Sequence, residues 1–167
     1  MKWRCPIIMK KSFIYAIAII SLTISSQAFS YNTALGLRFG PGIGFSIKHF
    51  TRSDVALEGI VHSLWHGFAM TGLYEVHARA FNVQGLYWYY GGGGHIGFWD
   101  GHYDPYWHHD RTAFALGIDG IIGMEYNIPE IPINLSLDFK PAFNIIPYFG
   151  FLGYYGDGFG FSIRYRF

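Results

Sequence analysis

The feature of this sequence that most restricts its fold is an alternation with a period of two residues. After residue 31, in segments of about ten residues, large apolar side chains alternate with small, polar or charged ones. A β-strand places successive side chains on opposite faces, whereas an amphipathic helix repeats every 3.6 residues. The alternation predicts eight strands, at 32–40, 43–50, 55–64, 69–81, 86–98, 112–126, 133–143 and 158–167.

Charged side chains occupy only one of the two faces that this alternation creates. Six of the eight Lys and Arg residues after residue 30 lie on this charged face, together with five of the eleven Asp and Glu residues. The remaining charges fall in the expected turns and loops, so the opposite face is apolar. The predicted polar network on the charged face consists of Arg38, Lys48, Glu58, His62, Glu75, His77, Arg79, His95, Asp119, Glu125, Asp138, Lys140, Arg164 and Arg166.

This pattern fits two architectures. A water-soluble barrel hides its apolar face and shows its charges to water. A membrane barrel does the reverse, with lipid outside and polar groups inside. Three features favour the membrane barrel, namely an export leader, an apolar face rich in aromatic residues, and the character of the last strand.

The N-terminus has the three parts of a secretory leader. Lys10 and Lys11 precede an apolar run at 13–22, and small and polar residues follow as far as Ser30. The run is shorter than the roughly 20 residues that a membrane-spanning helix needs. We therefore predict a cleavable signal peptide at 1–30 and a barrel at 31–167, with an uncleaved anchor helix as the alternative. Cleavage would also remove Cys5, the only cysteine, so the barrel does not depend on disulfides.

The chain closes with Phe-Gly-Phe-Ser-Ile-Arg-Tyr-Arg-Phe at 159–167. This stretch resembles the terminal strand of bacterial outer-membrane barrels, which the barrel-assembly machinery reads. The residues that carry this predicted assembly signal are Phe159, Phe161, Ile163, Tyr165 and Phe167.

Together with the eight segments and the leader, this ending makes the chain resemble the small eight-stranded outer-membrane barrels of the OmpA/OmpX type. The resemblance implies an all-β fold: an eight-stranded antiparallel transmembrane β-barrel with an up-and-down meander, preceded by a cleavable signal peptide. It further implies a monomer in contact with lipid, in the outer membrane of a Gram-negative bacterium.

The connections between the predicted strands alternate in the way that such a barrel requires. Short periplasmic turns are expected at 51–54, 82–85 and 127–132, and outer loops at 40–42, 65–67, 99–111 and 144–157. Pro141 lies late in the seventh predicted strand and has no N–H to donate to the ladder. We therefore expect a bulge or a strand end at Pro141.

The charged face predicts an interior filled by ion pairs. Eight strands leave an interior just wide enough for side chains, and buried charges are costly unless they are paired. We expect Glu58 to face His77 across the hairpin, because a register that sets Glu58 against Glu75 would be repulsive. A narrow, gated ion path through the same interior is the alternative.

Two stretches outside this pattern invite a chemical interpretation. The glycine-rich run at 92–97 matches G-x-G-x-x-G, but no helix follows it, so nucleotide binding is not expected. The outer loop at 99–111 is rich in aromatic, His and Asp residues whose spacing fits no closed metal site. We predict no cofactor and no metal, and expect an aromatic, polar surface loop. The alternative is a loop that contacts an unknown extracellular ligand, and its contact residues would be Trp99, His102, Tyr103, Tyr106, Trp107, His108 and His109.

The sequence points away from catalysis and from nucleic-acid binding. The formal net charge is +1, which creates no basic field. His62 and Ser63 are adjacent and so lie on opposite faces, and no nucleophile, base and orienting group come together. The predicted function is that of a structural or interaction protein, an adhesin-like membrane anchor with surface loops. The alternative is a small, gated, porin-like transport protein.

Overall fold

The computed structural model describes residues 32–64, 67–99, 113–146, 150–151 and 158–167. The predicted signal peptide at 1–30 lies outside the described residues, as do the loop contacts His102, Tyr103, Tyr106, Trp107, His108 and His109 and the side chain of Trp99. The strands are β1 (Thr33–Phe39), β2 (Ile43–Arg52), β3 (Val55–Leu64), β4 (Gly67–Arg79), β5 (Leu86–Trp99), β6 (Ala113–Asn127), β7 (Ile133–Lys140), β8 (Ala142–Ile146), β9 (Gly150–Phe151) and β10 (Gly158–Arg166).

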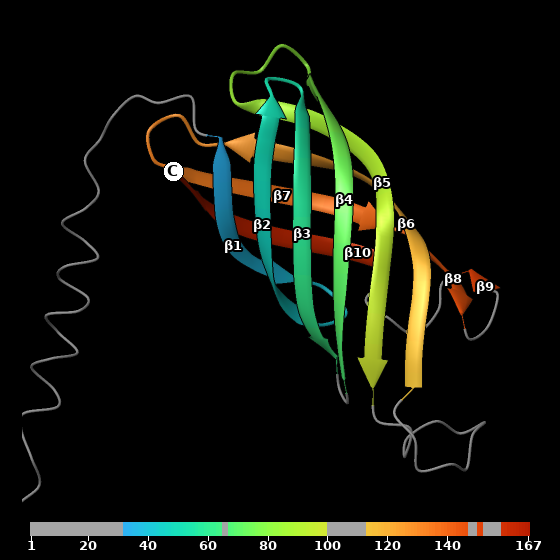
Figure 1. The fold of residues 1–167 in the computed structure, drawn as a ribbon. Helices are drawn as coiled ribbons and strands as arrows, with labels where there is room; N and C mark the ends of the chain where they lie inside the picture. Colours follow the sequence, from blue (N-terminus) through green and yellow to red (C-terminus); the bar gives the residue numbers. More distant parts are fainter. Residues whose placement is uncertain (1–31, 65–66, 100–112, 147–149, 152–157) are drawn as a thin grey trace, which may run out of the picture. The chain divides into compact units, whose positions relative to one another are not determined.

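These strands form a closed antiparallel barrel. Each strand from β1 to β6 pairs with the next, β7 pairs with β10, and β10 pairs with β1 to close the ring. Figure 1 shows β1 to β5 side by side in the near wall, with β7 and β10 crossing behind them. Since β8 continues the seventh strand beyond Pro141, the wall has eight strands in meander order. The predicted all-β, eight-stranded architecture is confirmed.

Pro141 interrupts the seventh strand, as its missing N–H requires. β7 ends at Lys140 and β8 begins at Ala142. β6 pairs with both pieces, and the N–H of Gly120 donates to the carbonyl oxygen of Pro141 at 2.9 Å. The expected strand end is therefore present, and β6 bridges it.

The two ends of the barrel differ in their connections. We call the end that carries the β2–β3, β4–β5 and β6–β7 connections the turn end, and the opposite end the loop end. At the turn end, the N–H of Val83 donates to the carbonyl oxygen of Ala80 at 3.1 Å. Phe81 and Asn82, with φ of 50° and 54°, form the corners of this tight turn. β1 begins and β10 ends at the turn end as well (Figure 1).

The expected pairing of Glu58 with His77 is wrong. In the β3–β4 hairpin Glu58 lies opposite Leu73, and Ala56 lies opposite Glu75. The reason is the shortness of the connection, since Leu64 already pairs with Gly67 and only two residues intervene. β4 thus starts earlier than predicted, which displaces the register.

Among the described residues, apolar packing inside the barrel centres on a small cluster. Ile60, Leu73, Tyr89 and Ile121 come from four consecutive strands and are almost completely buried. Within the described ranges, no helix is long and apolar enough to cross a membrane.

Candidate functional site

The charged face of the strands forms the interior of the barrel. Twelve of the fourteen residues of the predicted polar network are buried, at 6% exposure or less. These are Arg38, Lys48, Glu58, His62, Glu75, His77, His95, Asp119, Glu125, Asp138, Lys140 and Arg164.

Two members of the predicted network lie outside this buried set. Arg79 is exposed where β4 ends. Arg166 is half-buried, and its Nη2 donates to the carbonyl oxygens of Ile128 and Ile131 at 2.7 and 2.8 Å. Both residues lie at the turn end, where the alternation continues but the enclosing wall stops. The prediction that Arg79 and Arg166 belong to a buried network is therefore wrong.

The apolar face of the strands forms the outer surface. Twenty of its large side chains are between 38% and 73% exposed: Leu35, Leu37, Phe39, Phe45, Ile47, Leu57, Val61, Met70, Tyr74, Trp88, Tyr90, Phe114, Leu116, Ile118, Ile122, Leu137, Phe159, Phe161, Ile163 and Phe167. Others on this face, such as Leu135 and Phe139, are half-buried. Val55 has the same parity as Leu57 and Val61 in β3 but is buried, next to the bulge between Phe50 and Arg52. The residues of the predicted assembly signal share this outward orientation, with Tyr165 half-buried.

The turn-end half of the interior is organised around Lys48. Its Nζ lies 2.7 Å from Glu75, 3.3 Å from Glu58 and 3.4 Å from Glu125. All four side chains are almost completely buried, so each carboxylate depends on this single ammonium group for part of its compensation.

Arg164 reaches one of these carboxylates, Glu58, from β10. Its guanidinium forms an ion pair with Glu58 and donates to Ser46, Ser136 and Asn134 at 2.7, 2.8 and 3.2 Å. A guanidinium has five N–H donors in a fixed plane, and here several of them find acceptors on β2, β3 and β7. The side chain thus ties opposite parts of the wall together.

His77 completes the cluster. Its Nε2 lies 3.1 Å from Glu75 and its Nδ1 lies 3.4 Å from Glu125. Without His77, the cluster has two positive side chains, Lys48 and Arg164, against three carboxylates. A proton on His77 makes the cluster neutral. We call these six residues, Lys48, Glu58, Glu75, His77, Glu125 and Arg164, the Lys48 cluster.

Tyr89 links the Lys48 cluster to the pair formed by Arg38 and Asp138. Lys48 Nζ lies 4.1 Å from the centre of the Tyr89 ring, and His77 stacks on that ring at 5.2 Å between centres. The Tyr89 hydroxyl donates to Asp138 at 2.8 Å. The guanidinium of Arg38 forms a bidentate ion pair with the same carboxylate, with Nη1 at 2.7 Å. Tyr89 therefore contacts both polar groupings with a single side chain.

Nearer the loop end, the carboxylate of Asp119 contacts both Lys140 and His95. Lys140 Nζ lies 3.0 Å from Asp119, and His95 Nδ1 lies 3.1 Å from the same carboxylate. The Nε2 of His95 lies 2.8 Å from Asn144 Oδ1. A His–Asp pair could orient a catalytic base, but here the second ring nitrogen is held by an amide and not by a nucleophile. The arrangement is that of a structural hydrogen-bond chain.

Two polar side chains beside this chain lack partners. His62 Nε2 and Thr71 Oγ1 are buried and have no hydrogen-bond partner in the described part of the chain. Buried polar atoms of this kind are usually satisfied by ordered water. No group of three or more His, Cys, Asp or Glu residues suited to a metal occurs within the ranges that the structure describes.

Several polar partners of the network are absent from the list of charged and histidine residues that the sequence singled out. Ser46, Tyr89, Ser136 and Asn144 are all buried. The available signal was parity, the even spacing that puts residues of a strand on the same face: Ser46 is two residues from Lys48, and Ser136 is two from Asp138. Parity identifies the face of a residue but not its partner across the interior.

Comparison with known proteins supports the fold alone. No family model and no curated protein sequence matches the chain. The chain is similar to a solved structure, the N-terminal β-barrel domain of Pseudomonas aeruginosa OprF, with a TM-score of 0.60 and 15% sequence identity. The match covers 82% of this chain and 98% of that domain. The expected resemblance to small OmpA-type barrels is therefore confirmed at the level of the eight-stranded fold.

Proposed function

We propose that this chain is an outer-membrane β-barrel protein that serves as a membrane anchor for its surface loops. The observation that carries the proposal is the placement of polar and apolar groups around a closed barrel. Its outer surface is covered with exposed large apolar side chains, while five carboxylates and four Lys or Arg side chains are buried inside. In water such a surface would be an aggregation hazard, whereas in lipid it is the favourable arrangement.

Closure of the ring supports the same conclusion. In hydrocarbon each unpaired backbone N–H or C=O costs several kcal/mol, so a membrane sheet must have no edges. The β1–β10 pairing removes both edges of this sheet. With an even number of strands, the first strand begins and the last strand ends on the side of the short turns. In bacterial barrels this is the periplasmic side. We therefore assign the turn end to the periplasm and the loop end to the cell exterior, with an N-terminal signal peptide for export.

The filled interior favours an anchor over a pore. The Lys48 cluster and the Arg38–Asp138 pair connect side chains from β1, β2, β3, β4, β6, β7 and β10 across the centre. Opening a path for ions would separate several buried ion pairs at once. The proposed role thus lies with the surface, where the loop at 99–111 contacts an extracellular ligand, and catalysis forms no part of it.

Heat-modifiable migration after membrane fractionation tests the location. The expressed protein is expected in the outer-membrane fraction, and in detergent its mobility should change on boiling, because a closed barrel resists unfolding by detergent at low temperature. Recovery of a soluble protein in the periplasm, with the same mobility before and after boiling, would refute the proposal.

Two further measurements separate an anchor from a transport protein. In a planar bilayer the barrel should show no steady large conductance, and such conductance would favour the gated, porin-like alternative. Deletion of residues 99–111 should leave heat modifiability unchanged and abolish binding to host cells or matrix. Unchanged binding in that variant would contradict the role of the loop.

A further inference from the structure

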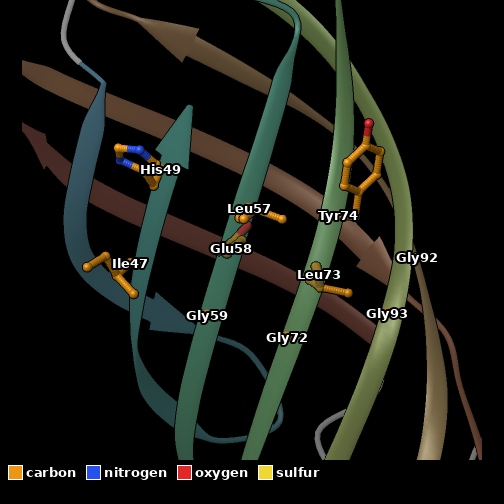
Figure 2. A pocket seen from close by; sticks show the side chains of 10 residues that line it. All are labelled: Ile47, His49, Leu57, Glu58, Gly59, Gly72, Leu73, Tyr74, Gly92 and Gly93. Atoms are coloured by element: carbon orange, nitrogen blue, oxygen red, sulfur yellow. The ribbon is translucent and has the colours of Figure 1, made fainter. Parts of the chain in front are cut away.

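The outer wall of the barrel carries a groove that the polar interior does not explain. It lies across β2, β3, β4 and β5 and has a volume of about 510 Å³ (Figure 2). Ile47, Leu57 and Tyr74 project beside it, each about half exposed. The groove therefore opens on the apolar outer surface and not into the interior.

Glycine residues form the floor of this groove. Gly59 pairs with Gly72 and Gly72 pairs with Gly94 across adjacent strands, and Gly92 lies on the same outward face of β5. A Cβ built on Gly72 would meet no atom within 4 Å. The space above Gly72 is thus open, so a side chain placed there would fill the groove without striking the wall.

One end of the groove is polar. On the outward face of β2, Ile43, Phe45 and Ile47 are followed by His49, which lines the groove near the turn end. His49 is exposed, and its Nδ1 lies 2.9 Å from the hydroxyl of Thr33. Arg52, also exposed, ends the same strand. The groove is therefore an apolar trough with the hydrogen-bonding side chain of His49 at its turn end. Arg52 does not line the groove, but it lies three residues further along the same strand.

We infer that this groove holds one acyl chain of a phospholipid, with the phosphate of the headgroup near His49 and Arg52. The inference rests on the proposed membrane location, and it assigns the lipid to the leaflet at the turn end. A hydrocarbon chain fits an apolar trough, and an anionic phosphate fits the His49 end. A second copy of the barrel is the less suitable occupant, because its apolar wall would bury His49 and Thr33 without new partners.

The test compares two leucine substitutions on the same outer surface. Gly72→Leu fills the groove, whereas Ser63→Leu adds the same side chain at an exposed position of β3 outside it. The purified proteins are reconstituted with phosphatidylglycerol, extracted into mild detergent, and analysed by native mass spectrometry for retained phospholipid. We expect retention by the wild type and by Ser63→Leu, and a loss of about tenfold in Gly72→Leu, which corresponds to about 1.4 kcal/mol.

Further variants protect the test against a failure of folding. Gly59→Leu fills the same groove, and its new Cβ would meet only the Ile47 side chain, at 3.4 Å. His49→Ala should reduce retention of phosphatidylglycerol but leave retention of a neutral diacylglycerol unchanged. All variants are first checked for heat-modifiable migration.

The outcomes distinguish this inference from the proposed function. Equal phospholipid retention in wild type, Gly72→Leu and Gly59→Leu, all folded and membrane-inserted, would overturn the inference alone. A dimer that Gly72→Leu abolishes would overturn it in favour of a second copy. A wild-type chain that fails to enter membranes would instead refute the proposed function.

Discussion

The ammonium group of Lys48 lies 2.7 Å from the carboxylate of Glu75, and both side chains are completely enclosed by the barrel wall. The two residues come from strands that are not neighbours, since β3 separates β2 from β4. Their contact therefore passes over β3 on the inner side of the wall and is not a pairing of adjacent strands. Removing either partner leaves a buried charge with too little compensation.

Lys48→Met should destabilise the barrel by about 3–5 kcal/mol, because Glu58, Glu75 and Glu125 would lose their shared cation. The measurement is the urea midpoint of unfolding in lipid vesicles. At each urea concentration, the folded fraction is the part of the protein that migrates as the folded form when the sample is not boiled. A second variant, Lys48→Met with Glu75→Gln, removes one carboxylate and should recover part of the loss. An unchanged midpoint for the single variant would contradict the role of the Lys48 cluster.

Tyr89→Phe and Asp138→Asn should differ in their effect on stability. Tyr89→Phe removes one hydrogen bond to Asp138 and should cost about 1 kcal/mol. Asp138→Asn leaves the buried guanidinium of Arg38 without its carboxylate and should cost about 3–5 kcal/mol. The same urea titration compares the two, and equal costs would show that the Arg38–Asp138 pair contributes little.

Leu137→Arg distinguishes a lipid-facing surface from a water-facing one. Leu137 is 58% exposed in the middle of β7. In a bilayer an arginine at mid-depth costs about 2–4 kcal/mol, whereas at an exposed site in water the change is usually within about 0.5 kcal/mol. Glu130→Arg, in the exposed β6–β7 turn, is the matched control. A small effect for both variants would argue for a water-soluble barrel.

Two glycine-to-alanine variants on neighbouring strands should behave differently. A Cβ on Gly93 would collide with the backbone of Gly72 and Leu73, while a Cβ on Gly72 has open space. Gly93→Ala should therefore destabilise the barrel by about 1–3 kcal/mol or prevent folding, and Gly72→Ala should fold normally. The readout is the yield of heat-modifiable protein after refolding in detergent, and similar yields would be inconsistent with the close approach.

Deletion of Phe167 tests the predicted assembly signal separately from stability. Phe167 is 63% exposed, and its N–H donates to the carbonyl oxygen of Thr33 at 3.0 Å. We expect several-fold less folded protein in the outer membrane of cells, with nearly normal refolding of the purified chain in detergent. A deletion that impairs both equally would indicate a structural role for Phe167.

Most of the fold was accessible from the sequence because strands have a strict period of two residues. The eight predicted segments coincide with the strands of the wall, and Pro141 marked the break between β7 and β8 through its missing N–H. Register was less accessible. It depends on the length of each turn, and a two-residue connection at 65–66 set Glu58 opposite Leu73 instead of His77.

The pairing inside the barrel could not be derived from the alternation. Lys48 interacts with carboxylates on β3, β4 and β6, and these contacts depend on the curvature of the closed ring. The apolar residues Ile60, Leu73 and Ile121 also point inward, contrary to a purely polar interior. Their neighbours Gly59 and Gly72 have no side chain, so the sequence around them does not show which positions face inward.

The seam between β1 and β10 joins the most distant parts of the barrel sequence. Arg38 and Ser162 lie opposite each other there, although they are 124 residues apart in the chain. Contacts between such remote segments form late and slowly, after the hairpins of the remaining wall. Until then, the unfinished sheet has two free edges that other chains can extend. The interval before β1 and β10 pair is therefore the stage of folding at which the chain is most exposed to aggregation.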